Sequence, residues 1–337
     1  MAQGSSGFDL SPSGSARIIR IGKRLYRELS SCPEFLGSVG QIYRTGFDLV
    51  LQDGRIIHVR GGAWLQSPFG AVIDQPGTQW IEAVSLREGD TFYREGNLLV
   101  CKTRIAFSIC LDPLHIVDLK RTLYSSPPSD ETVQFWIQVL TESIERWGRF
   151  DGVAGTLVLL RTELPHLCSK RLVPLSLWSR HALPRVKQLL QAVTEDDGDR
   201  FEEAWGSLLG IGPGLTPAGD DFLVGFLAVL TCFSSPFYKR LKSDNRIEAL
   251  KEKARHKTVT IASQFLTSAL DGVFSEILYL IFTSLITQRK NRGYAHSMCS
   301  AKENPMAIKC FLNWGHSSGT DTLAGVVLGF LCLLSAN

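Results

Sequence analysis

The first third of the chain alternates hydrophobic and polar positions with a period of two, which is typical of β-strands. Residues 47–60, FDLVLQDGRIIHVR, contain two such runs joined by Asp53-Gly54, a dipeptide that favours a hairpin turn. Residues 91–110 repeat the arrangement around Glu95-Gly96. We therefore expect a small antiparallel β-barrel or sandwich over residues 17–125, after a flexible tail at residues 1–16.

The pattern changes to a helical period of about 3.6 residues after SSPPSD, residues 125–130. Apolar side chains from Val133 to Trp147 then fall on one stripe of a helix. Residues 150–160, FDGVAGTLVLL, are interpreted as one more strand, and residues 288–309, with Gly293 and Pro305, as a polar loop. The pattern thus predicts an α+β protein whose residues 131–337 form a mainly helical domain, with helices at 184–194, 200–209, 217–233, 245–287 in two or three pieces, and 320–334.

Two segments of the helical part resemble each other at an offset of 100 residues. AGDDFLVG at 218–225 aligns without a gap with SGTDTLAG at 318–325, and the two share Gly, Asp, Leu and Gly at matching positions. Each follows a turn, GLTP or GHSS, and precedes an apolar helix. We interpret them as a pseudo-repeated glycine-rich turn-helix unit, and we expect the two helices to pack together with both N-terminal turns bordering one cleft.

The turns of this pseudo-repeat carry residues that start helices. Thr216 suits an N-cap and Pro217 the first helical position, while Ser317 or Ser318 can cap the second copy. The helix dipole favours negative charge in a first turn by about 0.3–1 kcal/mol. Three carboxylates are expected there: Asp220, Asp221 and Asp321.

Three interpretations of this region remain open. The glycine-rich stretch 210–217, GIGPGLTP, could cradle a phosphate at a helix start, although it lacks the lysine of a Walker loop and the preceding strand of a Rossmann fingerprint. The carboxylates could instead orient an amide or hold Mg²⁺, the one cofactor we consider. Alternatively, the residues only cap helices and allow close packing.

His316 is the best placed of the seven histidines, because it lies opposite Thr216 in the repeat and beside two serines. A histidine at a helix start is expected to stay neutral and act as a donor or base. The histidines show no metal-ligand spacing, so no bound metal is assigned, and His58 is interpreted as structural. The catalytic candidates are Asp220, Asp221, Asp321 and His316, and the substrate-binding candidates are Gly212, Gly214, Thr216, Gly219, Ser317, Ser318 and Gly319.

Composition narrows the class of protein. The 337 residues are 44% hydrophobic and carry a net charge of +3, which is too small to indicate nucleic-acid binding. The eight cysteines form no CxxC pair and are expected to be buried thiols in a reducing compartment. The longest apolar runs are shorter than the roughly 20 residues of a membrane span. We therefore expect a cytoplasmic protein without a membrane segment.

The two motifs GIGPGLTPAGDDFLVG (210–225) and GHSSGTDTLAG (315–325) together resemble a bacterial family, domain of unknown function 2877. This family includes the AllH-type subunit of oxamate carbamoyltransferase. The resemblance implies a cytoplasmic subunit that works beside an FdrA-like and an AllG-like protein. In the allantoin-degrading version, such a set transfers a carbamoyl group between oxalurate, phosphate, oxamate and carbamoyl phosphate. The resemblance brings no assignment of catalytic residues.

Three functional hypotheses follow. The first is a subunit of a carbamoyltransferase-type complex that handles a small anionic amide or carbamoyl substrate. The second is a non-catalytic scaffold or regulatory subunit, in which the glycine-rich helix pair only forms an interface. The third is a stand-alone Mg²⁺-dependent hydrolase of small amides. Whether the chain forms a homo-oligomer is left open.

Overall fold

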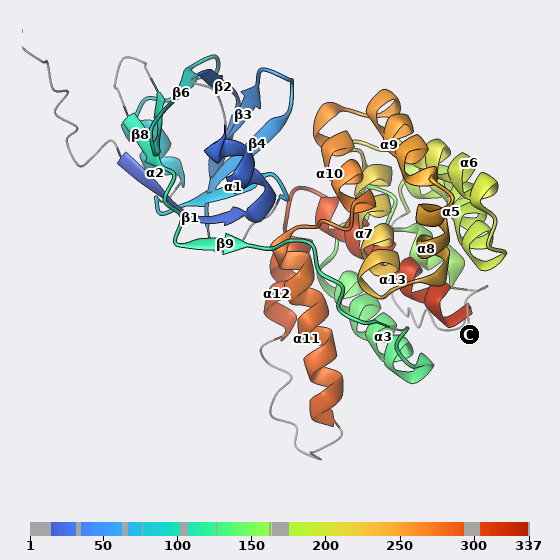
Figure 1. Ribbon diagram of the computed structural model, residues 1–337. Coiled ribbons are helices and arrows are strands. Elements are labelled where there is room, and N and C mark those ends of the chain that lie inside the picture. The colour runs from blue at the N-terminus through green and yellow to red at the C-terminus, as the bar shows by residue number, and fades with distance from the viewer. Residues whose placement is uncertain are drawn as a thin grey trace, which may run out of the picture. The chain divides into compact units, whose positions relative to one another are not determined.

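The computed structural model divides the chain into two compact units, with the boundary between Leu119 and Lys120 (Figure 1). Each unit is described by itself. The residues placed well enough to describe are 15–31, 35–62, 67–75, 77–101, 107–125, 127–161, 163, 175–292 and 304–335. The expected tail, residues 1–16, lies outside them except for its last two residues.

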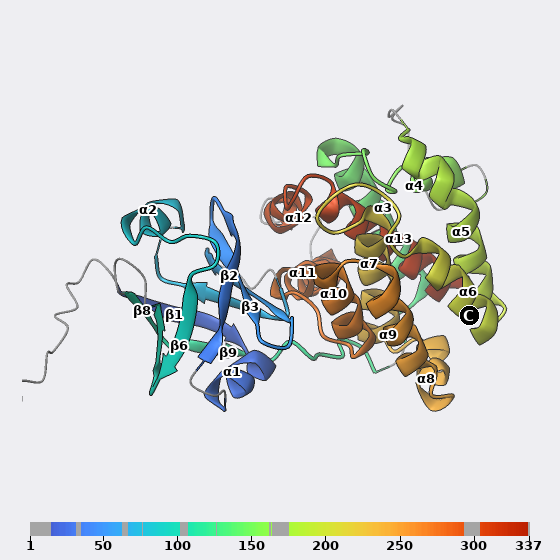
Figure 2. The ribbon, with the colours of Figure 1, turned by 90° about the horizontal axis from the view of Figure 1, so that it is seen from above.

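The first unit is a closed β-barrel with one additional strand (Figure 2). Its described strands are ordered β5-β4-β3-β2-β6-β7-β8-β1-β9, and the pairing of β5 with β1 closes the barrel. The bounds are β1 (Ser15–Gly22), β2 (Phe35–Tyr43), β3 (Gly46–Leu51), β4 (Ile56–Gly61), β5 (Gly70–Ile73), β6 (Thr91–Glu95), β7 (Leu98–Cys101), β8 (Phe107–Cys110) and β9 (His115–Val117), with helices α1 (Lys23–Ser30) and α2 (Gly77–Ala83).

Both predicted hairpins are present. Strands β3 and β4 pair antiparallel around Asp53-Gly54, and β6 and β7 around Glu95-Gly96. Both turn glycines have positive φ, the conformation for which glycine is favoured. Three pairings are parallel, namely β4 with β5 and β1 with both β8 and β9. The two pairs of β1 bring the first strand in the chain beside strands that come much later in the sequence.

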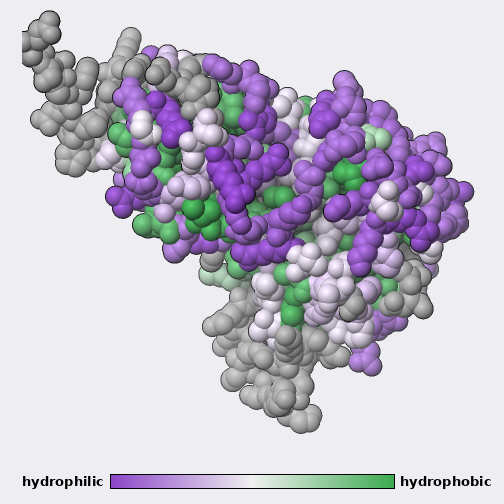
Figure 3. All heavy atoms as spheres, viewed as in Figure 1, coloured by the Kyte–Doolittle hydropathy of each residue, from purple (hydrophilic) through white to green (hydrophobic). Residues whose placement is uncertain are grey.

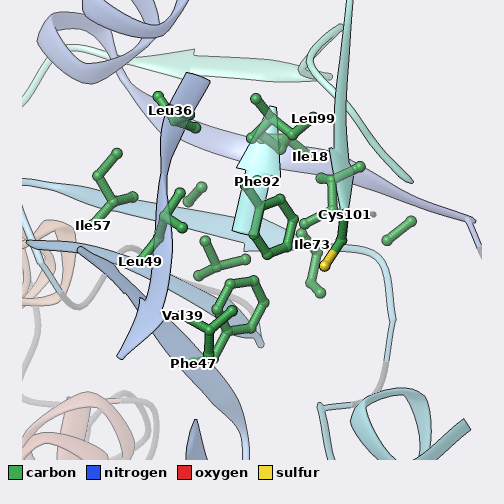
Figure 4. Close-up of a cluster of buried hydrophobic side chains, with 14 of the residues drawn as sticks. Ile18, Leu36, Val39, Phe47, Leu49, Ile57, Ile73, Phe92, Leu99 and Cys101 are labelled. Carbon is green, nitrogen blue, oxygen red and sulfur yellow. The ribbon is translucent and has the colours of Figure 1, made fainter. Parts of the chain in front are cut away.

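Apolar side chains from opposite walls fill the barrel, as Figure 4 shows. The ring of Phe92 stacks on Phe47 with centroids 5.5 Å apart and meets Phe107 edge-on at 5.6 Å. His58 is also buried, and its Nδ1 lies 2.6 Å from Oδ1 of Asp48. Both side chains alternate with core residues of β3 and β4, so this buried pair lies on the face of the strands away from the barrel's apolar core.

The second unit is helical. Its helices are α3 (Asp130–Trp147), α4 (Thr156–Leu160), α5 (Leu177–Thr194), α6 (Gly198–Leu208), α7 (Ala218–Cys232), α8 (Pro236–Ser243), α9 (Arg246–Lys257), α10 (Thr260–Leu270), α11 (Glu276–Arg292), α12 (Asn304–Leu312) and α13 (Ser318–Ser335). Helices α7 and α13 are mostly apolar after their first turns and lie inside the unit, surrounded by the others (Figures 1 and 2). The confirmed architecture is a β-barrel followed by a mainly helical region.

Three local predictions were wrong. Residues 156–160 form α4 and not a strand, because a short apolar run such as TLVLL has no periodicity that separates the two. Helix α5 begins at Leu177, and Pro184 lies inside it on the exposed side, where water can satisfy the backbone carbonyl that lacks a partner. The expected loop 288–309 contains the end of α11 and the first two thirds of α12, up to Lys309.

The described surface is mostly hydrophilic on the face shown in Figure 3, with small and separate apolar patches. Among the described residues, no single helix combines the length and apolar composition needed to cross a membrane. Helices α7 and α8, bent by 96°, pass that test only as a pair, by length and composition alone. Of the cysteines within the described ranges, three are buried, Cys110 is partly buried and Cys310 is exposed.

Candidate functional site

The two helices of the pseudo-repeat cross in direct backbone contact, and the contact is reciprocal. A Cβ placed on Gly225 would lie 1.8 Å from the carbonyl oxygen of Thr322, and one on Gly325 would lie 1.9 Å from that of Phe222. These four positions are two pairs at the same offset of 100 residues. The expected packing of the two repeat helices is therefore present, and only glycine fits at the crossing.

The helices run parallel, so both N-terminal turns lie at the same end. Thr216, just before α7, and Ser318, the first residue of α13, have hydroxyl oxygens 3.1 Å apart. The Thr216 hydroxyl also donates to Oδ2 of Asp221 at 2.9 Å. The positive ends of two helix dipoles therefore meet beside a carboxylate and two hydroxyls.

Asp221 is partly buried as a residue, whereas Asp220 and Asp321 are fully buried. The low-dielectric surroundings of Asp221 raise its pKa well above the usual value, and the nearby charge of Asp321 raises it further, while hydrogen bonds from Ser318 and Thr216 oppose the rise. Of the three predicted carboxylates, it is the one that combines exposure with contacts from both helix starts.

Asp321 is fully buried, and a backbone turn holds one of its oxygens. The N–H groups of Val153 and Ala154 both donate to Oδ1 at 2.8 Å. The other oxygen, Oδ2, has no hydrogen-bond partner. Burial raises the pKa of Asp321 to about 7, although the backbone donors and Ser317 lower it and Asp151 raises it. Near neutral pH the carboxyl group is therefore protonated in a large fraction of molecules, and the proton belongs on Oδ2.

The segment 148–154, which we call the 148–154 turn, is tightly packed against α13. A Cβ on Gly152 would lie 2.2 Å from Oδ2 of Asp321, so only glycine lets the carboxyl group sit there. The carbonyl of Gly152 accepts hydrogen bonds from the hydroxyls of Ser176 and Ser179 at the start of α5. The turn is thus fixed from α5 on one side and α13 on the other.

His316 lies on the surface and contacts residues of the same turn. Its Nδ1 is 2.9 Å from a guanidinium nitrogen of Arg149, and its Nε2 is 3.0 Å from Oδ2 of Asp151. It is therefore not paired with Thr216, the residue opposite it in the sequence repeat, whose partner is Ser318.

Asp220 has a different role from the other two aspartates. Its carboxyl group is buried and accepts hydrogen bonds from the backbone N–H of Gly210 at 3.0 Å and from the hydroxyl of Thr258. Burial raises its pKa to about 6, against the opposing effect of these two bonds. The side chain therefore ties the glycine-rich turn to the connection between α9 and α10, where Thr258 lies.

The glycine-rich turn itself needs glycine for backbone reasons. Gly210, Gly212 and Gly214 all have positive φ, between 74° and 118°. The N-cap of α7 is Pro217, and Thr216 makes no capping bond, because its hydroxyl is turned to Asp221. A Cβ on Gly219 would meet the carbonyl of Leu208 at 2.3 Å, and one on Gly319 would meet that of Phe311 at 1.8 Å.

Sequence reasoning missed the 148–154 turn, which it interpreted as part of a strand. The available signal was the pair of glycines in FDGVAG, which suits a backbone that another group approaches closely. Within the described residues, no three His, Cys, Asp or Glu side chains gather as a metal site.

Residues 208–330 match the model of a family described as oxamate carbamoyltransferase subunit AllH. The matched segment, just over a third of the chain, runs from the end of α6 into α13 and contains both copies of the pseudo-repeat. It confirms the resemblance to the AllH-type subunit over this segment. No solved structure matches the chain.

Proposed function

We propose that this chain is a subunit of a carbamoyltransferase-type complex that acts on oxalurate, oxamate and carbamoyl phosphate, together with FdrA-like and AllG-like proteins. The observation that carries the proposal is the meeting of two parallel helix starts at Thr216, Asp221 and Ser318, inside the segment that matches the AllH family. The family supplies the reaction, and the geometry supplies groups that suit it.

The reaction needs an anion site, an acceptor for an amide and a proton. In the direction that forms carbamoyl phosphate, a phosphate oxygen attacks the carbamoyl carbon of oxalurate, the bond from that carbon to the oxamate nitrogen breaks, and this nitrogen takes up a proton. The joined N-termini favour the negative charge of the phosphate. Asp221 can accept hydrogen bonds from the –NH₂ group, and the nearby carboxyl group of Asp321, whose pKa is raised to about 7, holds a proton in part of the molecules near neutral pH.

The test is reconstitution. The chain is purified with its FdrA-like and AllG-like partners, and carbamoyl phosphate is measured from oxalurate and phosphate. We expect Asp221→Asn and Asp321→Asn each to abolish the activity and to leave the fold intact, because each removes an ionisable group at the joined helix starts. Asp199→Asn is the control, since that side chain is 88% exposed on α6. Full activity in both variants would contradict the role of the carboxylates.

A second candidate is a non-catalytic scaffold. The reciprocal glycine crossing and the purely structural contacts of Asp220 favour it, because they account for several motif residues without a ligand. In that case the two Asn variants would keep transferase activity in the complex, whereas variants at the crossing would prevent assembly of the complex.

A further inference from the structure

The contact between Arg149 and His316 fixes the state of the imidazole. A guanidinium group only donates hydrogen bonds and is always charged. Nδ1 of His316, 2.9 Å away, must therefore accept, which makes the ring neutral with its proton on Nε2. That Nε2–H then donates to Asp151 at 3.0 Å. The three side chains form an ordered chain of hydrogen bonds in which the arginine uses one of its donors.

Arg149 is exposed, and within the described part of the chain its guanidinium group makes a hydrogen bond to His316 and forms no ion pair. Other arginines of the helical unit are neutralised: Arg200 pairs with Glu195, and Arg246 with Asp199 and Glu202. A full positive charge with several unused N–H donors thus stands next to a neutral ring.

The backbone beneath this charge is rigid. The N–H of Arg149 donates to the hydroxyl of Thr320 at 3.0 Å, and a Cβ on the preceding Gly148 would lie 2.8 Å from Thr320. Three residues further on, Gly152 packs against the carboxyl group of Asp321. The position of the arginine is therefore set by α13, the same helix whose N-terminus forms the candidate site.

The local field also favours an anion. The parallel N-termini of α7 and α13 contribute partial positive charge. Burial raises the pKa of Asp321 to about 7 and that of Asp221 well above its usual value, which reduces the negative charge beside the two helix N-termini. The remaining charge, on Asp151, is exposed to water and already bonded to His316.

We propose that Arg149, held beside His316 by the 148–154 turn, binds the oxyanion group of the substrate, a carboxylate or a phosphate. A guanidinium group matches the two oxygens of either group with two parallel hydrogen bonds. The residue lies outside the segment that matches the AllH family. The proposed function supplies only the identity of the substrate, and the binding itself is testable without it.

The experiment measures binding of oxamate and, separately, of inorganic phosphate to the purified full chain by isothermal titration calorimetry. Arg149→Gln should weaken binding of at least one of them tenfold or more. The affinity of Arg149→Lys should lie between those of the wild type and Arg149→Gln, since lysine keeps the positive charge and loses the two parallel N–H donors of the guanidinium group. Arg255→Gln on α9, whose guanidinium pairs with Glu252, is the matched control and should bind as tightly as the wild type. Which of the two anions responds identifies the group that is recognised.

Three outcomes would overturn the proposal: no binding of either anion by the wild type, equal binding by Arg149→Gln, or equal weakening in the Arg255→Gln control. Kinetics of the reconstituted complex separate this proposal from the proposed function. If Arg149→Gln supports carbamoyl transfer with an unchanged KM, the proposed anion site at Arg149 is contradicted and the proposed function stands. If anion binding depends on Arg149 but the complex shows no carbamoyl transfer, the anion site is supported and the proposed function is contradicted.

Discussion

The surroundings of the two oxygens of Asp321 favour opposite protonation states of its carboxyl group. Its Oδ1 is fixed by two backbone N–H groups of the 148–154 turn, which would suit an ionised group. Its Oδ2 is buried without a partner, which suits a protonated one. Burial is the larger effect and leaves the pKa near 7, so a small change of surroundings moves the proton.

This raised pKa predicts how stability depends on pH. The folded protein binds the Asp321 proton more tightly than the unfolded chain, whose value is near 3.8. This proton therefore adds a few kcal/mol, in order of magnitude, to the free energy of unfolding. The contribution is complete below about pH 4 and is lost as the pH rises through 7. Asp321→Asn removes the ionisation, so its free energy of unfolding should fall less between pH 5 and pH 8 than that of the wild type, as measured by urea unfolding.

Asp199→Asn is the control for this comparison, because its side chain is exposed and its curve should run parallel to that of the wild type. Parallel curves for the wild type and Asp321→Asn would contradict the prediction.

At the level of single residues, the sequence could identify Asp221 and Asp321 as equivalent positions of a repeat. It could not show that they differ in environment. Asp321 is buried because the 148–154 turn covers it, and that turn is about 170 positions away in the chain. Asp221 receives side-chain hydroxyls instead. Contacts of this kind depend on tertiary packing and leave no mark on local periodicity.

At the scale of elements, the glycine crossing of α7 and α13 makes a sharp prediction. In Gly225→Ala the new methyl group would sit 1.8 Å from a backbone carbonyl, so the helices must separate. We expect a loss of about 3 kcal/mol in the free energy of unfolding, the upper range for an overpacked core. Urea unfolding of the variant measures it.

Gly206→Ala on α6 is the matched control. Its nearest neighbours are the end of the Lys257 side chain at 3.4 Å and Lys253 at 3.7 Å, which are ordinary contacts with flexible groups. Alanine should therefore stabilise this helix by up to about 1 kcal/mol. Equal effects at Gly206 and Gly225 would show that the close approach at the crossing is unimportant.

The elements themselves differed in how well the pattern predicted them. Both hairpins carry a turn glycine between β-prone runs, so their position is set locally. Helix α4 is a short apolar run that fits strand or helix equally, and its surroundings decide. Helix α5 extends through Pro184, against the local preference for a helix start there, because it buries a stripe from Ala182 to Val193.

For the whole molecule, the two units have separate cores, one inside the barrel and one around α7 and α13. We therefore expect two unfolding transitions in differential scanning calorimetry. Phe92→Ala, which removes a fully buried ring of the barrel, should lower one transition. Gly225→Ala should lower the other. A single transition that both variants shift equally would mean that the two units unfold as one.

The change from a period of two to 3.6 allowed the order of a β part and a helical part to be predicted from the sequence. The closure of the barrel could not, because it depends on β1 pairing with β5 and β8, far along the chain. The position of the 148–154 turn could not be predicted from the sequence either, because it depends on hydrogen bonds with both α5 and α13.

The reciprocal crossing gives the candidate site an approximate two-fold axis, running along the parallel helices between them. A frame with two equal halves would accept a molecule with unlike ends in either of two orientations at equal energy. The 148–154 turn makes its hydrogen bonds to the pair through α13, where it brings the Arg149 cation and two backbone N–H donors. That single asymmetric addition is enough to choose one orientation, and so to decide which end of a bound molecule faces which carboxyl group.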